Sequence, residues 1–250
     1  MSLVDHATAL CWTDRLLTPA ARSEPVGPLL VADSWLVVDG ATRAEDAHWA
    51  RFGDACLRLG VETAAFRQAV TSAVPALGRW WPRVELTAEG VLRLRVRPAP
   101  VPGAGAPRVT VAAPGDPRAC PRRKGPDLDM LIGLRSRSGA DELLLCDADG
   151  GLREGTSSSL LWWEDGVLWT TPAEHTLPGV TRALVVAFAR EHGVDVRVRS
   201  PSPAQLAGRE VWLTSALHGI RPVGEWLSPP QAAGPAERAP AWQAALEAMR

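Results

Sequence analysis

The chain has 250 residues, of which 46% are hydrophobic and 22% are charged, a composition typical of a soluble globular protein. Its formal net charge is −1, which excludes a strongly basic surface for nucleic acid or an anionic membrane. No hydrophobic stretch approaches the ~18 residues that a membrane-spanning helix needs, and the N-terminus has charges early and no signal-peptide core. Four widely spaced cysteines predict neither a metal site nor disulfides, so we expect a cytoplasmic protein.

The residue usage leaves a single lysine, Lys124, among 27 basic residues. Where only positive charge is needed, arginine serves equally well, but a guanidinium cannot lose its proton near neutral pH. The surviving lysine therefore indicates a role that needs a neutral amine, and the preceding Arg122 and Arg123 would favour that form. The alternative is a solvated basic linker.

The first half of the chain predicts strands and helices. Residues 26–40 are apolar and end in an Asp-Gly turn, which suits a hairpin strand. Residues 44–60 have helical spacing, and a second helical stretch follows them. Residues 91–98 alternate apolar residues with arginine, the pattern of a half-exposed strand, and residues 107–114 form another strand.

The second half is more regular. Helical patterns cover residues 128–138 and 177–193, while residues 141–150 and 210–223 are strands that end in turns. Residues 158–171 predict a β-hairpin around an Asp-Gly turn.

A stretch rich in proline, glycine and alanine, residues 113–126, predicts a domain boundary. We expect an N-terminal α+β domain over 1–114, a linker over 115–126 and a C-terminal α/β domain over 127–250. Lys124 lies at the end of the linker.

Glu154 follows a predicted strand and turn, at the mouth of the hairpin. A carboxylate at such a place can hold a protonated pyridine nitrogen and so make a pyridine ring an electron sink. The alternative is an ordinary turn glutamate.

Two further segments have the character of phosphate sites. The sequence LPGVTR, residues 177–182, places a glycine directly before a helix, whose free N–H groups and Thr181 hydroxyl can bind phosphate oxygens. Thr214 and Ser215 end a strand and add two hydroxyls at a turn. The alternatives are a plain helix start and simple turn chemistry.

Taken in order, these segments resemble the class IV, fold-type IV pyridoxal-phosphate enzymes, which include branched-chain and D-amino-acid aminotransferases and aminodeoxychorismate lyases. The resemblance covers roughly residues 30 to 224. It rests on ADSWLVVDG, HWARF, EGTSSSLLWW, LPGVTR and LTSALHGIRPV. It implies a two-domain α+β / α/β fold of the D-amino-acid aminotransferase type, with a small N-terminal domain and a larger, barrel-like C-terminal domain.

The resemblance also implies roles for individual residues. Lys124 would be the catalytic Schiff-base lysine and proton shuttle, Glu154 would pair with the pyridine nitrogen, and Arg51 would reach the phosphate. The remaining phosphate ligands would be Val180, Thr181, Thr214 and Ser215. Two arginines are candidates for binding a substrate carboxylate, Arg97 and Arg221.

The sequence departs from the family pattern at several positions. Ser159, which we count among the cofactor-binding residues, stands where the family has an asparagine, and a hydroxyl makes fewer contacts than an amide. The chain has no tyrosine to place beside the cofactor. Relatives carry an asparagine after the lysine, and the resemblance leaves Asp127, Asp129 or neither residue for its role.

The leading hypothesis is an aminotransferase that uses pyridoxal 5'-phosphate, acts on an amino acid and a keto acid, and forms a homodimer. One alternative is aminodeoxychorismate lyase, which forms p-aminobenzoate and pyruvate. A second alternative is a non-catalytic relative that acts as a binding protein. No metal, nucleic acid or membrane partner is expected.

Overall fold

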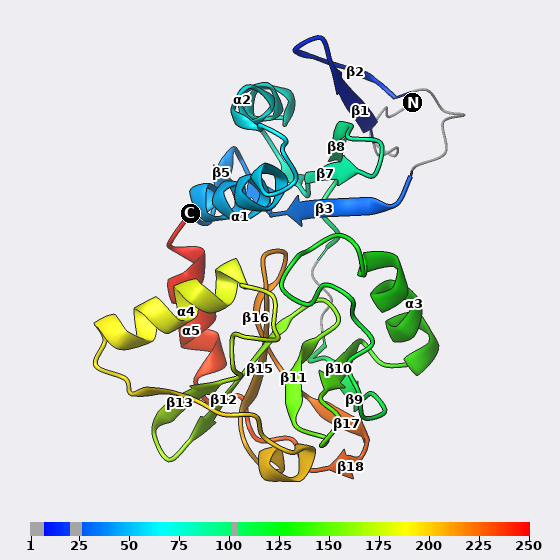
Figure 1. Cartoon of the computed structure of the whole chain (residues 1–250). Helices are drawn as coiled ribbons and strands as arrows, with labels where there is room; N and C mark the ends of the chain where they lie inside the picture. Colours follow the sequence, from blue (N-terminus) through cyan, green and yellow to red (C-terminus); the bar gives the residue numbers. More distant parts are fainter. Residues whose placement is uncertain (1–7, 21–26, 102–104) are drawn as a thin grey trace. The chain divides into compact units, whose positions relative to one another are not determined.

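A computed structural model describes residues 8–20, 27–101 and 105–250 (Figure 1). The segments 1–7, 21–26 and 102–104 lie outside the described residues. Residue 26, at the start of the strand predicted over 26–40, is among them. The chain divides into two compact units. The first unit comprises Met1–Val101, Arg123–Pro126 and Arg250, and the second comprises Pro102–Arg122 and Asp127–Met249.

An antiparallel sheet and two helices form the first unit. The strand order is β2 (Leu16–Pro19), β1 (Thr8–Thr13), β8 (Leu92–Val96), β7 (Arg83–Thr87), β3 (Leu29–Ser34). A smaller sheet joins β5 (Ala41–Thr42), β4 (Val37–Val38) and β6 (Arg79–Trp80). The helices are α1 (Glu45–Leu57) and α2 (Ala64–Ala73).

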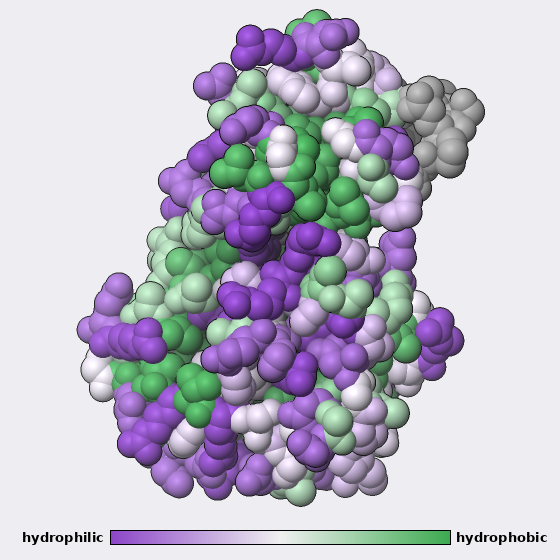
Figure 2. Space-filling model, viewed as in Figure 1, coloured by the Kyte–Doolittle hydropathy of each residue, from purple (hydrophilic) through white to green (hydrophobic). Residues whose placement is uncertain are grey.

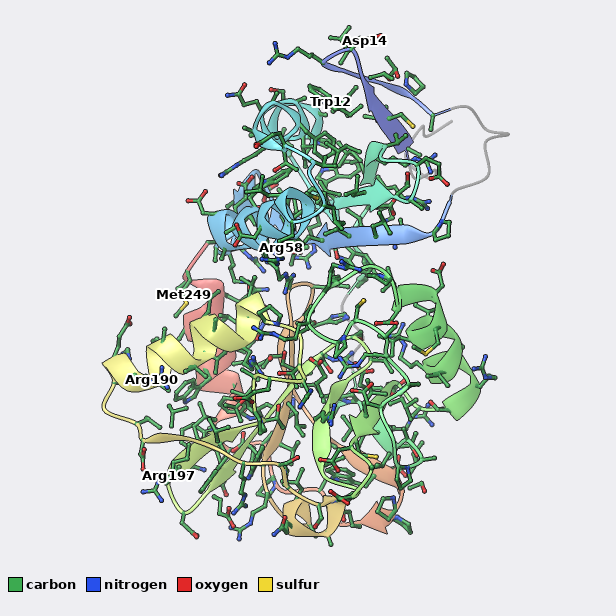
Figure 3. The ribbon with its side chains drawn as sticks, in the orientation of Figure 1. Trp12, Asp14, Arg58, Arg190, Arg197 and Met249 are labelled. Carbon is green, nitrogen blue, oxygen red and sulfur yellow. The ribbon has the colours of Figure 1, made fainter. Side chains whose placement is uncertain are left out.

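Aromatic side chains fill the space between the helices and the sheet of this unit. On α1, His48, Trp49, Phe52 and Cys56 are buried at helical spacing, so one stripe of the helix faces the core. Phe66 of α2 completes the cluster at 6.2 Å from Trp49 and 6.4 Å from Phe52, measured between ring centroids. Figure 3 shows Trp12 of β1 beside α2, where its ring meets Phe66 edge-on at 5.8 Å.

The expectation that residues 91–98 form a half-exposed strand is wrong. β8 lies inside the sheet between β1 and β7. Leu92 and Leu94 are buried on one face, and Arg93 on the other face is only 7% exposed. The alternation of apolar residues with arginine reflects two chemically different buried faces, rather than one buried and one solvated face.

Two sheets and three helices make up the second unit. One sheet has the order β11 (Leu152–Gly155), β10 (Glu142–Cys146), β9 (Arg108–Val111), β17 (Glu225–Ser228), β18 (Pro230–Gln231). The other has the order β14 (Val196–Val198), β13 (Val167–Thr170), β12 (Ser159–Glu164), β15 (Val211–Ser215), β16 (Gly219–Pro222). The helices are α3 (Leu128–Ser138), α4 (Val180–Glu191) and α5 (Ala239–Glu247), with a short 3-10 turn, η1 (Pro203–Leu206).

Strand β12 shows how this unit is layered. Because successive side chains of a strand point to opposite faces, Leu160 and Trp162 enter the core between the two sheets. Leu161 and Trp163 enter the core under α4 and α5. Figure 1 shows these two helices, yellow and red, side by side against this sheet. Each fully buried leucine of this kind stabilises the fold by about 1.5–3 kcal/mol.

The units differ from the domains predicted from composition. Strand β9, expected in the N-terminal domain, pairs in parallel with both β10 and β17 and so belongs to the second unit. Residues 123–126, expected in a linker, belong to the first unit.

On the face shown in Figure 2, hydrophobic residues reach the surface in groups among hydrophilic ones, as is normal for globular proteins.

Candidate active site

The backbone around Lys124 is fixed to strand β3. The N–H of Ala32 donates a hydrogen bond of 2.7 Å to the carbonyl oxygen of Lys124. Gly125 follows with φ +140°, and a Cβ there would lie 2.8 Å from the Cα of Val31. Only glycine permits both this backbone conformation and this close approach. Lys124 is therefore held by the sheet of the first unit and is not part of a solvated linker.

The surroundings of Lys124 favour its neutral form. Burial lowers the pKa of its amine to about 8, and the positive charges of Arg51, Arg83 and Arg97 act in the same direction. The carboxylate of Asp33 opposes them. A large fraction of the amine is thus uncharged slightly above neutral pH, which a nucleophilic lysine requires.

The arginines that lower this pKa are not the ones expected from the sequence. Arg122 and Arg123 precede Lys124 in the chain, but the arginines that lower the pKa of its amine come from α1 and from the β7–β8 region. Proximity in the fold, rather than in the sequence, sets the charge of the lysine.

Arg51, the predicted phosphate ligand, forms a bidentate ion pair with Asp33. Its Nε and Nη2 donate to Oδ2 and Oδ1, each at 2.7 Å, and Nδ1 of His48 donates to Oδ1 at 2.9 Å. Burial of Asp33 alone would raise its pKa, but Arg51 and His48 outweigh burial and hold that pKa well below its usual range. Burial lowers the pKa of His48, so this ring is neutral.

Asp33 and His48 were missed in the sequence, although a signal exists for both. The helix motif HWAR places His48 and Arg51 three residues apart, hence on one helix face. Asp33 is a carboxylate inside an apolar strand, and such a group needs a cationic partner.

The substrate candidate Arg97 has one unused donor. Its guanidinium carbon lies 4.1 Å from the centre of the Trp81 ring, and its Nε donates to the Trp81 carbonyl oxygen at 3.3 Å. Its Nη2 is buried and makes no hydrogen bond with any described residue. Burial, assisted by Arg83 and Arg95, lowers its pKa to about 10. This guanidinium therefore carries a buried donor with no acceptor.

Glu154 is buried at the end of β11 in the second unit. It forms an ion pair with Arg118, and its Oε1 also accepts the backbone N–H of Leu177 at 2.8 Å. Burial raises the pKa of Glu154, and the contact with Arg118 opposes that rise. Asp116 holds Arg118 from the other side at 2.7 Å. The carboxylate is thus fixed in one orientation by a charge chain inside the fold.

Arg118 was also missed, because it lies in the stretch read as a low-complexity linker. Its spacing of two from Asp116 is the only local signal. The contact with Glu154 joins positions 36 residues apart and cannot be read from periodicity.

The second unit brings together both predicted phosphate segments and Ser159. Helix α4 begins at Val180 after Gly179, and no side chain caps its first N–H groups. A Cβ on Gly179 would lie 2.4 Å from Oγ of Ser159. Ser159 in turn is the register partner of Thr214, whose Oγ1 donates to the Ser159 carbonyl oxygen at 3.4 Å. Thr181 on the first turn of α4 is 5% exposed.

Two further predicted residues, Ser215 and Arg221, line a polar cavity of about 310 Å³ in the second unit. The hydroxyl of Ser215 accepts the N–H of His218 at 3.3 Å and so closes the turn between β15 and β16. Arg221 lies on β16 opposite Leu213.

The loop from Glu154 to Ser159 is held by Glu142, a further residue that the sequence analysis missed. Glu142 is 1% exposed and accepts hydrogen bonds from the hydroxyls of Thr156, Ser157 and Ser158. Three consecutive hydroxyl residues after Glu154 thus serve one buried carboxylate.

The carboxylate of Asp127, a candidate to replace the family's asparagine, binds the backbone of the preceding loop. It accepts the backbone N–H groups of Ala119 and Cys120 at 3.0 and 2.9 Å. Among the residues that the structure describes, no cluster of histidine, cysteine and acidic side chains could hold a metal, and no helix has the length and hydrophobicity to cross a membrane.

Residues 30–226 match the amino-transferase class IV family. The chain belongs to this family. Its members are pyridoxal-phosphate enzymes, so the resemblance seen in the sequence is confirmed.

The branched-chain-amino-acid aminotransferase of Salmonella typhimurium is 34% identical over 97 residues, 38% of this chain and 31% of that protein. The corresponding enzyme of Pseudomonas aeruginosa is 30% identical over 107 residues, 42% of this chain and 35% of that protein. The matched segment thus spans about a third of the length of these curated relatives.

Solved structures confirm the fold of this class IV chain. A fold IV transaminase from Curtobacterium pusillum superposes with a TM-score of 0.77 at 22% identity, over 97% of this chain and 96% of that one. A putative 4-amino-4-deoxychorismate lyase from Legionella pneumophila gives a TM-score of 0.74 at 16% identity, over 92% of this chain and 97% of that one. At these identities the likeness establishes the fold-type IV architecture alone.

Proposed function

We propose that this class IV chain is an aminotransferase that binds pyridoxal 5'-phosphate covalently at the amine of Lys124. The observation that carries the proposal is the state of that amine. It belongs to the chain's single lysine, its backbone is fixed to β3, and burial lowers its pKa to about 8. A neutral, positioned amine is the group that attacks an aldehyde.

The second unit supplies groups that suit the phosphate of this cofactor. The start of α4 offers uncapped N–H groups, which bind anions because of the helix dipole. The hydroxyls of Thr181 and Thr214 belong to buried residues, and Gly179 keeps the space before Ser159 free of a side chain. We assign Val180, Ser159 and the Ser215 turn to the same phosphate site.

The family resemblance gives Arg51 of the first unit and Glu154 of the second unit roles in holding the cofactor. Arg51 would add a positive charge for the phosphate, in an orientation that Asp33 fixes through both ion-pair bonds. Glu154 would accept the pyridine N–H, with Arg118 keeping its carboxylate in place. When bound, the cofactor supplies an electron sink next to the substrate.

Lys124 and Arg97 would act on the substrate. The Nζ of Lys124 would take the α-proton of the amino acid and return a proton during transfer of the amino group. The buried, unused Nη2 of Arg97 would bind the substrate carboxylate, because Arg–carboxylate pairs satisfy such donors well. The curated relatives are named branched-chain-amino-acid aminotransferases, which makes leucine, isoleucine and valine the first donors to test.

Aminodeoxychorismate lyase remains a second candidate. The segments ADELLLCDADG and EGTSSSLLWW resemble the lyase branch about as well as the transaminase branch. The same lysine would then move a proton while pyruvate leaves and p-aminobenzoate forms. A non-catalytic relative is disfavoured, because a lysine kept only for charge would gain nothing from a lowered pKa. We also propose a homodimer in the cytoplasm, as the family resemblance implies.

One experiment tests the function and separates its forms. Purified protein is incubated with pyridoxal phosphate, and its visible absorption is recorded with and without amino donors. The proposal predicts a yellow protein whose band bleaches with an amino acid and returns with a keto acid. Pyruvate released from aminodeoxychorismate without amino-donor exchange would instead identify the lyase, and a protein that stays colourless contradicts both.

A further inference from the structure

A polar cavity of about 310 Å³, the volume of about ten water molecules, lies wholly within the second unit. It opens between the C-terminal part of α3, the start of β10, the loop after Glu154 and the β15–β16 turn. The charged and polar residues lining it are Arg135, Asp141, Glu142, Ser157, Ser158, Ser215, His218 and Arg221.

The two carboxylates of this cavity already have dedicated partners. Asp141 accepts the backbone N–H of Arg108 at 2.9 Å and pairs with its guanidinium at 3.3 Å. Glu142 is saturated by the hydroxyls of the loop after Glu154. Asp141 also attracts Arg221 through space, but among the described residues neither acidic group forms an ion pair with an arginine of the cavity.

The two arginines of this cavity, by contrast, have no ion pair. Arg135 donates from Nη1 to the Ser157 hydroxyl at 2.9 Å, and neither it nor Arg221 pairs with a carboxylate of the described residues. Two other half-buried arginines of the unit, Arg118 and Arg153, are ion-paired. A half-buried guanidinium without an anion is only partly solvated and is therefore available to bind one.

The pKa of His218, which also lines this cavity, is lowered by burial and by the two arginines. Burial, together with the charges of Arg221 and Arg135, lowers its pKa to about 4. The ring is therefore neutral at physiological pH and offers one N–H donor beside the two guanidinium groups. The hydroxyl of Ser215 accepts the backbone N–H of His218 and keeps its own proton to donate, whereas the Ser158 proton is already donated to Glu142.

We propose that this cavity binds a small organic carboxylate, and best a dicarboxylate, with Arg135 and Arg221 as its charged ligands. A guanidinium matches the planar shape of a carboxylate with two parallel hydrogen bonds. Two arginines from separate elements, α3 and β16, each lacking an anionic partner, suit two carboxylates of one ligand. The carboxylate belongs either to a dicarboxylic keto acid used as substrate or to a separate anion.

Succinate tests binding directly, because it has two carboxylates but neither an amino nor a keto group. Its binding therefore does not depend on the aminotransferase activity. Calorimetric titration of the full chain should show succinate binding, which Arg135→Leu and Arg221→Leu each weaken about tenfold or more, as expected for a charged hydrogen bond. Arg221→Lys keeps the charge and should weaken binding less than Arg221→Leu.

Two exposed arginines provide controls for these variants. Arg137→Leu changes the same helix α3 outside the cavity, and Arg190→Leu changes α4, where Figure 3 labels the residue. Both should bind succinate like the unaltered protein. Circular dichroism checks that all variants are folded. Loss of binding in the controls, or no succinate binding by the unaltered protein, would overturn the proposal.

Kinetics with Arg135→Leu distinguish the two sources of the carboxylate. A higher KM for 2-oxoglutarate but not for pyruvate assigns the cavity to the second carboxylate of a keto-acid substrate. Unchanged KM values together with lost succinate binding assign it to a separate anion. If the protein lacks aminotransferase activity but binds succinate, the proposed function fails while the cavity proposal stands.

Discussion

The N–H of Ala32 in strand β3 donates a 2.7 Å hydrogen bond to the carbonyl oxygen of Lys124. A lysine that the sequence places in a Pro/Gly-rich linker is thereby built into the sheet of the first unit. This bond and the close packing of Gly125 on Val31 fix the backbone from which the amine projects. The low pKa of the amine follows from that buried position.

The first prediction concerns pH. Lys124 has a pKa of about 8, below the ordinary value of 10.5. The rate of covalent attachment of pyridoxal phosphate should therefore rise from pH 7 to 9 with a midpoint near 8, measured by stopped-flow absorbance. The depressed pKa also means that the unfolded chain binds more protons here, so this group's contribution to stability rises with pH between about 8 and 10.5. A rate midpoint near pH 10 would contradict the assigned environment.

The second prediction concerns Asp33. Asp33→Asn removes the anion that pairs with Arg51 and leaves a guanidinium that is largely buried. Loss of one member of a buried pair should cost about 3–5 kcal/mol of unfolding free energy, measured with urea. The stabilisation by Asp33 is present above the ordinary carboxyl pKa and is lost as the pH falls through the lower value of the folded state.

A matched control for Asp33 is Asp46→Asn, which removes a surface ion pair with Arg67 on the helices of the same unit. Because Asp46 is exposed, the cost should stay below about 1 kcal/mol. Equal losses of unfolding free energy in the two variants would show that the buried ion pair stabilises the fold no more than a surface ion pair does.

The third prediction concerns the start of α4. Gly179→Ala would place a Cβ 2.4 Å from Oγ of Ser159, which must then move out of the phosphate site. Affinity for pyridoxal phosphate should fall about tenfold, measured by equilibrium titration. The double variant with Ser159→Gly should recover part of the space, and Gly105→Ala, where nothing lies within 4 Å, should leave affinity unchanged. An unchanged affinity in Gly179→Ala would exclude this helix start from the cofactor site.

The fourth prediction concerns the loop after Glu154. Glu142→Leu removes the acceptor of three hydroxyls, of which the buried Thr156 hydroxyl is left unpaired. A buried unpaired donor costs about 1–3 kcal/mol, so thermal unfolding should begin several degrees lower. Glu62→Leu, an exposed residue before α2, serves as the control. A variant as stable as the unaltered protein would mean that other contacts order this loop.

Local patterns predicted the regular elements well. The helix expected over residues 128–138 matches α3, and the hairpin expected over 158–171 contains β12 and β13. Strand alternation and helical spacing are local properties, and they survive folding wherever one face packs against a core. The family match covers the segments in which the ordered motifs were found.

Long-range partners were not predictable in the same way. The ion pair of Arg118 with Glu154 and that of Asp33 with Arg51 join distant segments, and no local spacing encodes them. Strand β9 was assigned to the wrong side of the boundary because composition marks loops, whereas strand pairing decides which unit a strand joins.

We propose that Lys124 carries the cofactor, and reductive trapping of the bound group on the chain is a direct test. Protein loaded with pyridoxal phosphate is reduced with borohydride, digested and mapped by mass spectrometry. We expect one phosphopyridoxyl group on the peptide that contains Lys124, and none in Lys124→Arg. A label elsewhere in the chain, or no label on the unaltered protein, would contradict it.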